Sequence, residues 1–353
     1  MDIRAVKKLF KWFLIFIGLV LVVQMVGIGS RQTEMRMRKW MKEAVTDTFE
    51  QAASRSRELY GLKSLDPDNG MNRMPGSSPV ILVHGLDEPG LVWSSLIPAL
   101  EDREYWTLVF TYPNDQDIDT SARFFIEELR RRPALKGKTV TIVAHSMGGL
   151  VTRHMLTDPE IGYEDDKYEG RIPKVEKVIM VGTPNHGSQM ARFRFVTEAR
   201  DQFWHWNNTD VSFLHAFLDG AGEAGIDLLP GSEFLENLNA QPHPFNTRYF
   251  LVAGMVATWF MDDAKSLMGT EGASRDGEDY RFHSSSNEFR NQMTGWSATI
   301  GDGLVPVSSV ALDGWPLIIV PGGHLDMIRN YPWQSGRTPP AVPVVLDLIS
   351  RSY

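Results

Sequence analysis

The sequence of 353 residues contains no cysteine. Disulfide bonds, a cysteine nucleophile and a thiolate metal site are therefore excluded. The absence does not assign a compartment, because cysteine-free domains occur in reducing and in oxidising surroundings.

No H-x-x-x-H pair is present, so we expect no metal centre of that helical type, although a Ca²⁺ site made of scattered carboxylates remains an alternative. Neither G-x-x-x-x-G-K-[ST] nor G-x-G-x-x-G follows a predicted strand, which argues against a nucleotide-binding protein.

Acidic residues outnumber basic ones, and the net charge is -8 at pH 7. Nucleic acid needs clustered lysine and arginine, so we expect no nucleic-acid partner. One basic region, residues 31–42, adjoins an apolar N-terminal run, where it is placed to face lipid head groups. The remaining composition, 42% hydrophobic and 23% charged, is that of an ordinary globular protein.

The apolar run extends from Trp12 to Ser30 without a charged residue. As a helix it would be about 28 Å long, close to the hydrocarbon thickness of a bilayer. We therefore predict a transmembrane anchor over residues 1–31, with a signal peptide as the alternative. The short tail before it is hard to translocate because it is positively charged, so we expect the rest of the chain on the outer, extracytoplasmic (periplasmic) side. The charges of this tail are Arg4, Lys7, Lys8 and Lys11.

Residues 32–78 are predicted to connect this anchor to a globular domain. Residues 32–62 are polar, contain no proline and favour a helical stalk, whereas residues 66–78 are rich in Gly, Pro and Asn and indicate a linker. The globular domain is predicted to span residues 79–353.

Short apolar runs alternate with helical patterns along this domain. The runs cover residues 79–84, 105–112, 139–144, 175–182, 248–253 and 317–320, and the helical patterns cover residues 92–100, 118–131, 150–156 and 343–350. Continuous apolar runs are typical of strands buried on both faces of a parallel sheet. The alternation predicts an α/β fold with a doubly wound, mostly parallel sheet and helices on both faces.

Two stretches interrupt the alternation. Residues 188–244 are rich in aromatic side chains, and residues 258–296 combine Trp259, Phe260 and Met268 with a charged region. We interpret both as insertions over the carboxyl edge of the sheet, forming a lid or cap. The aromatic residues favour an apolar acyl pocket, and ordinary core under a cap is an equally good interpretation.

The third predicted strand leads directly into Ala144-His145-Ser146-Met147-Gly148, and a helical pattern follows. This is the strand, turn and helix arrangement of a nucleophile elbow, in which a serine occupies a strained turn between small neighbours. Ala144 and Gly148 meet that requirement. The helix N-terminus favours developing negative charge beside the hydroxyl. Ser146 is therefore the predicted nucleophile.

At four motifs the sequence resembles α/β-hydrolases of the lipase and esterase type. The motifs are His84-Gly85-Leu86, A-H-S-M-G-G at 144–149, G-T-P-N-H-G-S at 182–188 and G-D-G-L-V-P at 301–306. The resemblance extends from about residue 79 to the C-terminus and is weak in the two insertions. It implies an acyl-ester hydrolase without an organic cofactor, with the catalytic residues in the chain order Ser, acid, His.

Within this order we predict His324 as the base and Asp302 as the acid that orients it. His324 follows the sixth strand between two glycines and Leu325, at the strand end where such sheets carry their chemistry. Asp302 precedes it by 22 residues, which leaves room for one strand. Asp313 and Asp326 are the fallback acids. His154, inside a predicted helix, and His186, in a loop that resembles a structural motif, are the less favoured histidines.

An oxyanion hole requires two backbone N–H donors. We predict Met147, which follows the nucleophile, and Leu86, in the loop after the first strand, with His84 shaping that loop. The expected function is hydrolysis of carboxylic esters, in particular the lipid-like esters of a lipase or esterase, with the substrate and the membrane as partners. An acyltransferase or thioesterase would use the same triad, and a non-catalytic membrane-bound scaffold is a different class of alternative. The sequence does not indicate the oligomeric state.

Overall fold

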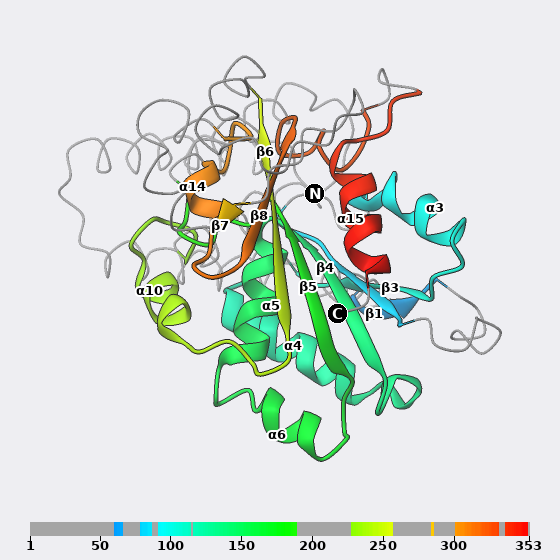
Figure 1. The fold of residues 1–353 in the computed structure, drawn as a ribbon. Coiled ribbons are helices and arrows are strands. Elements are labelled where there is room, and N and C mark those ends of the chain that lie inside the picture. The colour runs from blue at the N-terminus through cyan, green and yellow to red at the C-terminus, as the bar shows by residue number, and fades with distance from the viewer. Residues whose placement is uncertain are drawn as a thin grey trace, which may run out of the picture. The chain divides into compact units, whose positions relative to one another are not determined.

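The protein is built around a sheet of eight strands, shown in Figure 1. The computed structural model describes residues 60–65, 78–86, 91–113, 116–188, 227–256, 284–285, 301–331 and 336–351. The strands are β1 (Gly61–Ser64), β2 (Val80–Val83), β3 (Thr107–Thr111), β4 (Thr139–His145), β5 (Lys174–Val181), β6 (Arg248–Met255), β7 (Ser284–Ser285) and β8 (Pro316–Pro321). Their order across the sheet is β1-β3-β2-β4-β5-β6-β8-β7.

The six strands from β3 to β8 in this order are parallel, and one antiparallel strand closes each edge. The six strands predicted from apolar runs are confirmed, each to within two residues at either end. The apolar runs reflect burial of the strands on both faces of the sheet. In β4, for example, residues 140–145 are all buried. The parallel register brings the carboxyl ends of β2, β4, β5, β6 and β8 to one edge.

Helices cover both faces of the sheet. They are the 3₁₀ turns η1 (Leu91–Trp93) and η2 (Pro133–Leu135) and the α-helices α3 (Leu96–Glu101), α4 (Ile118–Arg130), α5 (Met147–Thr157), α6 (Tyr163–Tyr168), α10 (Glu233–Ala240), α14 (Val307–Val310) and α15 (Ala341–Ser350). Figure 1 shows α3 and α15 on one side of the sheet and α4, α5 and α6 on the other.

Alternate residues of one strand supply the two cores. Ile81 and Val83 of β2 belong to the core under α4 and α5, whereas Val80 and Leu82 belong to the core under α3 and α15. All four side chains are fully buried. The period of two along a strand explains this division, because successive side chains point to opposite faces.

The four predicted helical patterns correspond to helices, although the first of them is divided into η1 and α3. In α4, the buried Ile118, Ala122, Phe125, Ile126 and Leu129 recur at helical spacing and face the sheet. The helix begins after Asp117, whose side chain accepts a hydrogen bond of 2.5 Å from the Thr120 amide. That cap satisfies one of the amides that a helix start leaves without a partner.

The N-terminal side of the domain differs from expectation. The helical stalk was predicted to reach Leu62, but residues 61–64 form β1, which pairs with β3. Leu62 is fully buried in the core beside α4, and this burial outweighs the helical tendency of the preceding residues. The remainder of the predicted stalk, and residues 1–31, lie outside the described residues. Among the described residues, none of the helices combines the length and the apolar composition that a membrane span requires.

Part of the first predicted insertion is described. Residues 233–240 form α10, which contacts α5 and is capped by the Ser232 side chain through the Leu235 amide. In the second insertion, residues 284–285 form β7 at the edge of the sheet. Residues 188, 227–232 and 241–244 of the first insertion are also described. Residues 189–226 and the rest of the second insertion lie outside the described residues, and a lid formed by them stays a prediction.

Candidate active site

The residues predicted to carry the chemistry follow the carboxyl ends of neighbouring strands. Leu86 comes after β2, Ser146 directly after β4, and His324 after β8. Asp302 is distant in sequence from β6, but its turn is attached to the end of that strand, because the Val256 amide donates to the Gly301 carbonyl at 2.9 Å. The carboxyl edge of a doubly wound sheet is where such folds bind their ligands.

Ser146 is held in an uncommon backbone conformation. Its φ of 53° and ψ of -130° lie outside the regions that residues with a side chain prefer. The turn is supported on the strand side by a hydrogen bond of 2.9 Å from the Ser146 amide to the Val181 carbonyl. Strain of this kind persists only where surrounding structure enforces it. The strained strand-to-helix turn is the geometry of a nucleophile elbow.

The loop after β2 packs directly against this turn. A Cβ atom on Gly148 would lie 2.3 Å from the His84 carbonyl oxygen, and one on Gly85 would lie 2.7 Å from Cβ of Ser146. Neither distance is compatible with a side chain. The small residue expected at position 148 is therefore required by the neighbouring backbone, and the Gly85 backbone lies close to the serine side chain.

His84 is fixed by bonds within its own loop and to β3. Its Nε2 accepts from the Tyr112 amide at 3.3 Å, so Nδ1 carries the proton and donates to the Gly85 carbonyl at 2.8 Å. The Tyr112 hydroxyl donates to the His84 carbonyl at 2.8 Å. Burial lowers the pKa of His84 to about 4. A neutral imidazole with both nitrogens engaged shapes the loop, as the sequence predicted.

Asp302 and His324 are in direct contact. Oδ2 of Asp302 lies 2.7 Å from Nδ1 of His324, and both side chains are almost completely buried. The other oxygen, Oδ1, accepts from the Leu304 and Val305 amides at 2.9 and 2.7 Å. Since a carboxylate only accepts, the bond requires the proton on Nδ1 and leaves Nε2 of the neutral imidazole able to take a proton.

His324 also packs against the elbow. Its ring lies 4.7 Å from the ring of His145, and the His324 carbonyl lies 3.0 Å from Nε2 of His145. Among the hydrogen bonds of the described residues, none joins the Ser146 hydroxyl to His324. Catalytic hydrogen bonds are often long without substrate and shorten when it binds. The structure thus brings the predicted acid and the predicted base together and places His324 beside the residue that precedes the serine.

The two predicted oxyanion donors belong to different segments next to the serine, Met147 as its chain neighbour and Leu86 in the loop after β2. Met147 is the first residue of α5, and amides of the first helical turn have no carbonyl partner within the helix. Leu86 follows Gly85, whose α-carbon faces the Ser146 side chain. Both amides therefore belong to segments that border the hydroxyl.

The other candidate acids and histidines have different surroundings. Asp313 is exposed. Asp326 forms an ion pair of 3.5 Å with Arg337. His154 contacts Asp119 at 2.9 Å on the far part of α5, and His186 lies 3.4 Å from the Asn239 side chain. Their surroundings favour Asp302 and His324 as the acid and the base.

Two supporting residues were not predicted from the sequence. The sequence indicated His145 only as part of the elbow motif. In the structure its imidazole contacts both the ring and the backbone carbonyl of His324. Arg153 is fully buried and donates to the Asn185 side chain at 3.0 Å, while Asn185 donates to the Val310 carbonyl at 2.7 Å. Burial lowers the pKa of Arg153 to about 10. Asn185 lies in one of the four motifs, and this was the only sequence feature that could have pointed to its structural role.

The sequence matches the model of a family described as "Alpha/beta hydrolase family" over residues 80–330. This chain belongs to the α/β-hydrolase family. The match includes all four motifs, so the resemblance on which the predictions rest is confirmed. No curated protein matches the sequence.

Solved structures agree with the fold of an α/β-hydrolase. The chain is similar to the mature lipase BlEst2 of Bacillus licheniformis, with a TM-score of 0.51 and 19% identity over 82% of this chain and 98% of the lipase. It is also similar to the metagenomic carboxyl esterase MGS0156, with a TM-score of 0.51 and 17% identity over 79% of this chain and 76% of the esterase. At these identities the likeness shows the fold alone.

Proposed function

We propose that this α/β-hydrolase is a serine hydrolase that cleaves carboxylic esters, with lipid-like esters as its substrates. The observation that carries the proposal is the buried hydrogen bond of 2.7 Å between Asp302 and His324, beside the strained turn of Ser146. A serine hydroxyl is a weak nucleophile at neutral pH and needs a base that is itself oriented by a third group. The three residues fit these roles in the chain order of the family.

The proposed reaction proceeds through an acyl-enzyme. Ser146 attacks the ester carbonyl while Nε2 of His324 takes the hydroxyl proton, and Asp302 stabilises the resulting imidazolium. The amides of Leu86 and Met147 donate to the oxyanion of the tetrahedral intermediate, and losing one such donor costs about 3 kcal/mol of barrier. His324 then protonates the leaving alcohol. Water activated by the same imidazole releases the acid and restores the serine.

The preference for lipid-like esters rests on three supports. The first predicted insertion is rich in aromatic residues, which suit an acyl chain. The predicted anchor at residues 1–31 would hold the enzyme at a lipid surface. The similar solved proteins are a lipase and a carboxyl esterase by name.

The test combines covalent labelling with turnover of nitrophenyl esters of short and long acyl chains. A fluorophosphonate probe should label the protein, and Ser146→Ala should lose the label and about 10⁶-fold in activity. The matched control is Ser350→Ala, which removes an exposed hydroxyl at the end of α15 that donates to the Asp347 carbonyl. Labelling or hydrolysis that persists in folded Ser146→Ala would show that Ser146 is not the nucleophile. Faster turnover of short chains than of long ones would remove the lipid-like substrate class.

A further inference from the structure

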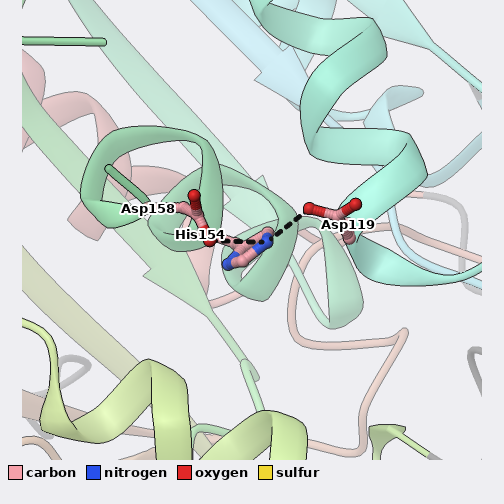
Figure 2. Close-up of side chains that lie close together, drawn as sticks. All are labelled: Asp119, His154 and Asp158. Carbon is pink, nitrogen blue, oxygen red and sulfur yellow. Dashed lines mark hydrogen bonds and ion pairs between the residues drawn. The ribbon is translucent and has the colours of Figure 1, made fainter. Parts of the chain in front are cut away.

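A histidine and two aspartates converge where α4 meets the C-terminal end of α5. Nε2 of His154 lies 2.9 Å from Oδ1 of Asp119 and 3.6 Å from Oδ2 of Asp158, as Figure 2 shows. The three possible ligand atoms lie within 4.8 Å of one another. We propose that Asp119, His154 and Asp158 bind one divalent transition-metal ion of the Zn²⁺ type.

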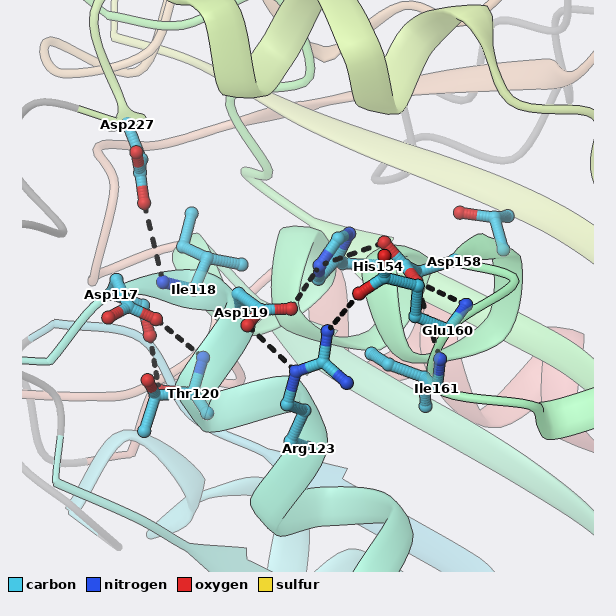
Figure 3. A network of polar contacts seen from close by, with 12 residues as sticks. Asp117, Ile118, Asp119, Thr120, Arg123, His154, Asp158, Glu160, Ile161 and Asp227 are labelled. Carbon is cyan, nitrogen blue, oxygen red and sulfur yellow. Dashed lines mark hydrogen bonds and ion pairs between the residues drawn. The ribbon is translucent and has the colours of Figure 1, made fainter.

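The remaining oxygen of each aspartate is held by a neighbour. Oδ1 of Asp158 accepts from the Glu160 amide at 2.7 Å and from the Ile161 amide at 3.3 Å. Oδ2 of Asp119 accepts from Nε of Arg123 at 2.8 Å. These contacts, drawn in Figure 3, turn the other oxygen of each carboxylate towards the imidazole. Outer contacts that orient the ligands are a regular part of protein metal sites.

Carboxylates outnumber the basic side chain at this cluster. The carboxylates of Asp119 and Asp158 contact His154, and the guanidinium of Arg123 pairs with Asp119 and with Glu160. With a neutral imidazole these side chains carry three negative charges and one positive charge. A divalent ion bound at His154 would neutralise the surplus.

The ligand types select the class of metal. An imidazole nitrogen with two carboxylates suits Zn²⁺ and its transition-metal neighbours, whereas Ca²⁺ and Mg²⁺ prefer oxygen ligands alone. The His154 side chain is only 12% exposed, and the Phe234 ring of α10 packs edge-on against it at 5.2 Å. One side of the imidazole is thus apolar, and water would supply the fourth ligand on the open side.

The expected role of the ion is to link two helices. Asp119 belongs to the first turn of α4, and His154 and Asp158 lie four residues apart at the end of α5. Ser146 precedes the same helix, and at 1.5 Å per residue it lies about 12 Å along the axis from His154 and about 18 Å from Asp158. The ion would therefore stabilise the helix that follows the elbow without contacting the reacting groups. Metal binding at this position does not depend on the proposed hydrolase activity.

This site lacks the H-x-x-x-H pattern, in which two histidines four residues apart bind a metal, so a search for that pattern does not find it. The helix contributes a His and an Asp at that spacing instead, and the third ligand comes from a position 35 residues earlier. Only the packing of α4 against α5 brings Asp119 to the imidazole.

The test is a titration of the untagged full-length protein with Zn²⁺ by calorimetry, and with Co²⁺ by visible absorption. We expect one ion per chain, a rise in melting temperature with Zn²⁺, and Co²⁺ bands typical of nitrogen and oxygen ligands. His154→Gln and Asp158→Asn should each weaken binding at least tenfold and remove the thermal shift. Both should retain ester hydrolysis.

The matched control is Glu127→Gln, which removes an exposed carboxylate of α4 that pairs with Arg130 outside the cluster. Its metal binding should equal that of the unmodified protein. Circular dichroism without metal checks that each variant is folded. If His154→Gln does not fold, Asp158→Asn is the variant that tests the proposal. Absence of Zn²⁺ binding at about 100 µM, the lower end of the dissociation constants of weak extracellular Ca²⁺ sites, would overturn the proposal. Equal binding by a folded cluster variant would overturn it as well.

Discussion

Asp302 holds His324 through both its side chain and its backbone. The carboxylate contacts Nδ1 at 2.7 Å, and the Asp302 carbonyl accepts from the His324 amide at 3.0 Å. The side-chain contact orients the imidazole, and the backbone contact fixes the segment that carries it. The proposed acid and base are therefore one structural unit, although 22 residues separate them.

Asp302→Asn should lower kcat for ester hydrolysis about 10⁴-fold with a small change in stability. The amide that replaces the carboxylate can donate to Nδ1, which favours the imidazole tautomer with its proton on Nε2. That tautomer cannot take the serine proton. Steady-state kinetics with a nitrophenyl ester measures the effect, and a thermal melt measures the stability.

The control for this substitution is Asp313→Asn, since Asp313 is an exposed carboxylate between Asp302 and His324 in the chain. We expect its kcat to match that of the unmodified enzyme. A larger loss from Asp313→Asn than from Asp302→Asn would show that Asp302 is not the acid.

Gly182→Ala should reduce activity as well as stability. Gly182 has a φ of +61°, and a Cβ there would lie 3.2 Å from both Oδ2 of Asp302 and Cε1 of His324. It would also lie 2.6 Å from Cε of Met327, a flexible side-chain end. The added methyl group would therefore press against the proposed acid and base. We expect a fall in kcat of about tenfold or more, as small misplacements of catalytic groups produce.

The matched variant is Gly162→Ala. Gly162 has a φ of +76°, and a Cβ added there would meet no atom within 4 Å, so this change introduces backbone strain alone. It should cost about 1 kcal/mol of stability and leave kcat unchanged. Equal kinetic losses in the two variants would show that strain, and not contact with the catalytic pair, limits activity.

Much of the fold could be predicted because each parallel strand is a short apolar run buried on both faces. The elbow was predictable for a related reason, since the small residues around Ser146 reflect the close approach of the His84 backbone. Asp302 and His324 could be selected by chain order, and His324 also by its position shortly after a predicted strand. Their hydrogen bond could not be predicted from the sequence, because it depends on the hydrogen bond that joins the Gly301 carbonyl to the end of β6.

The features that were missed depend on contacts between distant segments. Residues 61–64 carry no strong strand pattern, and they form β1 because β3 offers an edge and Leu62 fills the core beneath it. The pairing of buried Arg153 with Asn185 joins α5 to the loop after β5. No local pattern around either residue predicts its partner.

Stability should fall as the pH decreases from about 6.5 towards 4. Burial lowers the pKa of His84 to about 4 from its usual 6.5, so the unfolded chain takes up a proton over this interval that the folded protein does not. A shift of this size corresponds to about 3 kcal/mol, present at neutral pH and lost on acidification. His243, whose pKa burial also lowers to about 4, acts in the same direction.

Urea unfolding at several pH values across this interval checks the dependence. His84→Gln should have a shallower slope than the unmodified protein, because the substituted side chain does not titrate. The remaining slope includes the contribution of His243. An unchanged slope in the folded variant would assign the pH dependence to other groups.

We propose that residues 1–31 anchor the enzyme, with its catalytic domain on the extracytoplasmic side. Deletion of these residues should move the protein from the membrane fraction to the soluble fraction, and its activity on a short-chain ester should persist. Fractionation followed by fluorophosphonate labelling measures both. A truncated protein that still sediments with membranes would assign membrane binding to another part of the chain.

The crowding around the elbow also limits how this protein can be diversified. At Gly148 the obstacle is backbone, that of His84 and Val83, so no exchange of neighbouring side chains creates room. At Gly149 the obstacle is the side chain of Thr183, whose Oγ1 would lie 2.1 Å from an added Cβ. A mutant library can therefore explore position 149 only together with a smaller residue at 183, whereas every variant at position 148 starts from a displaced main chain.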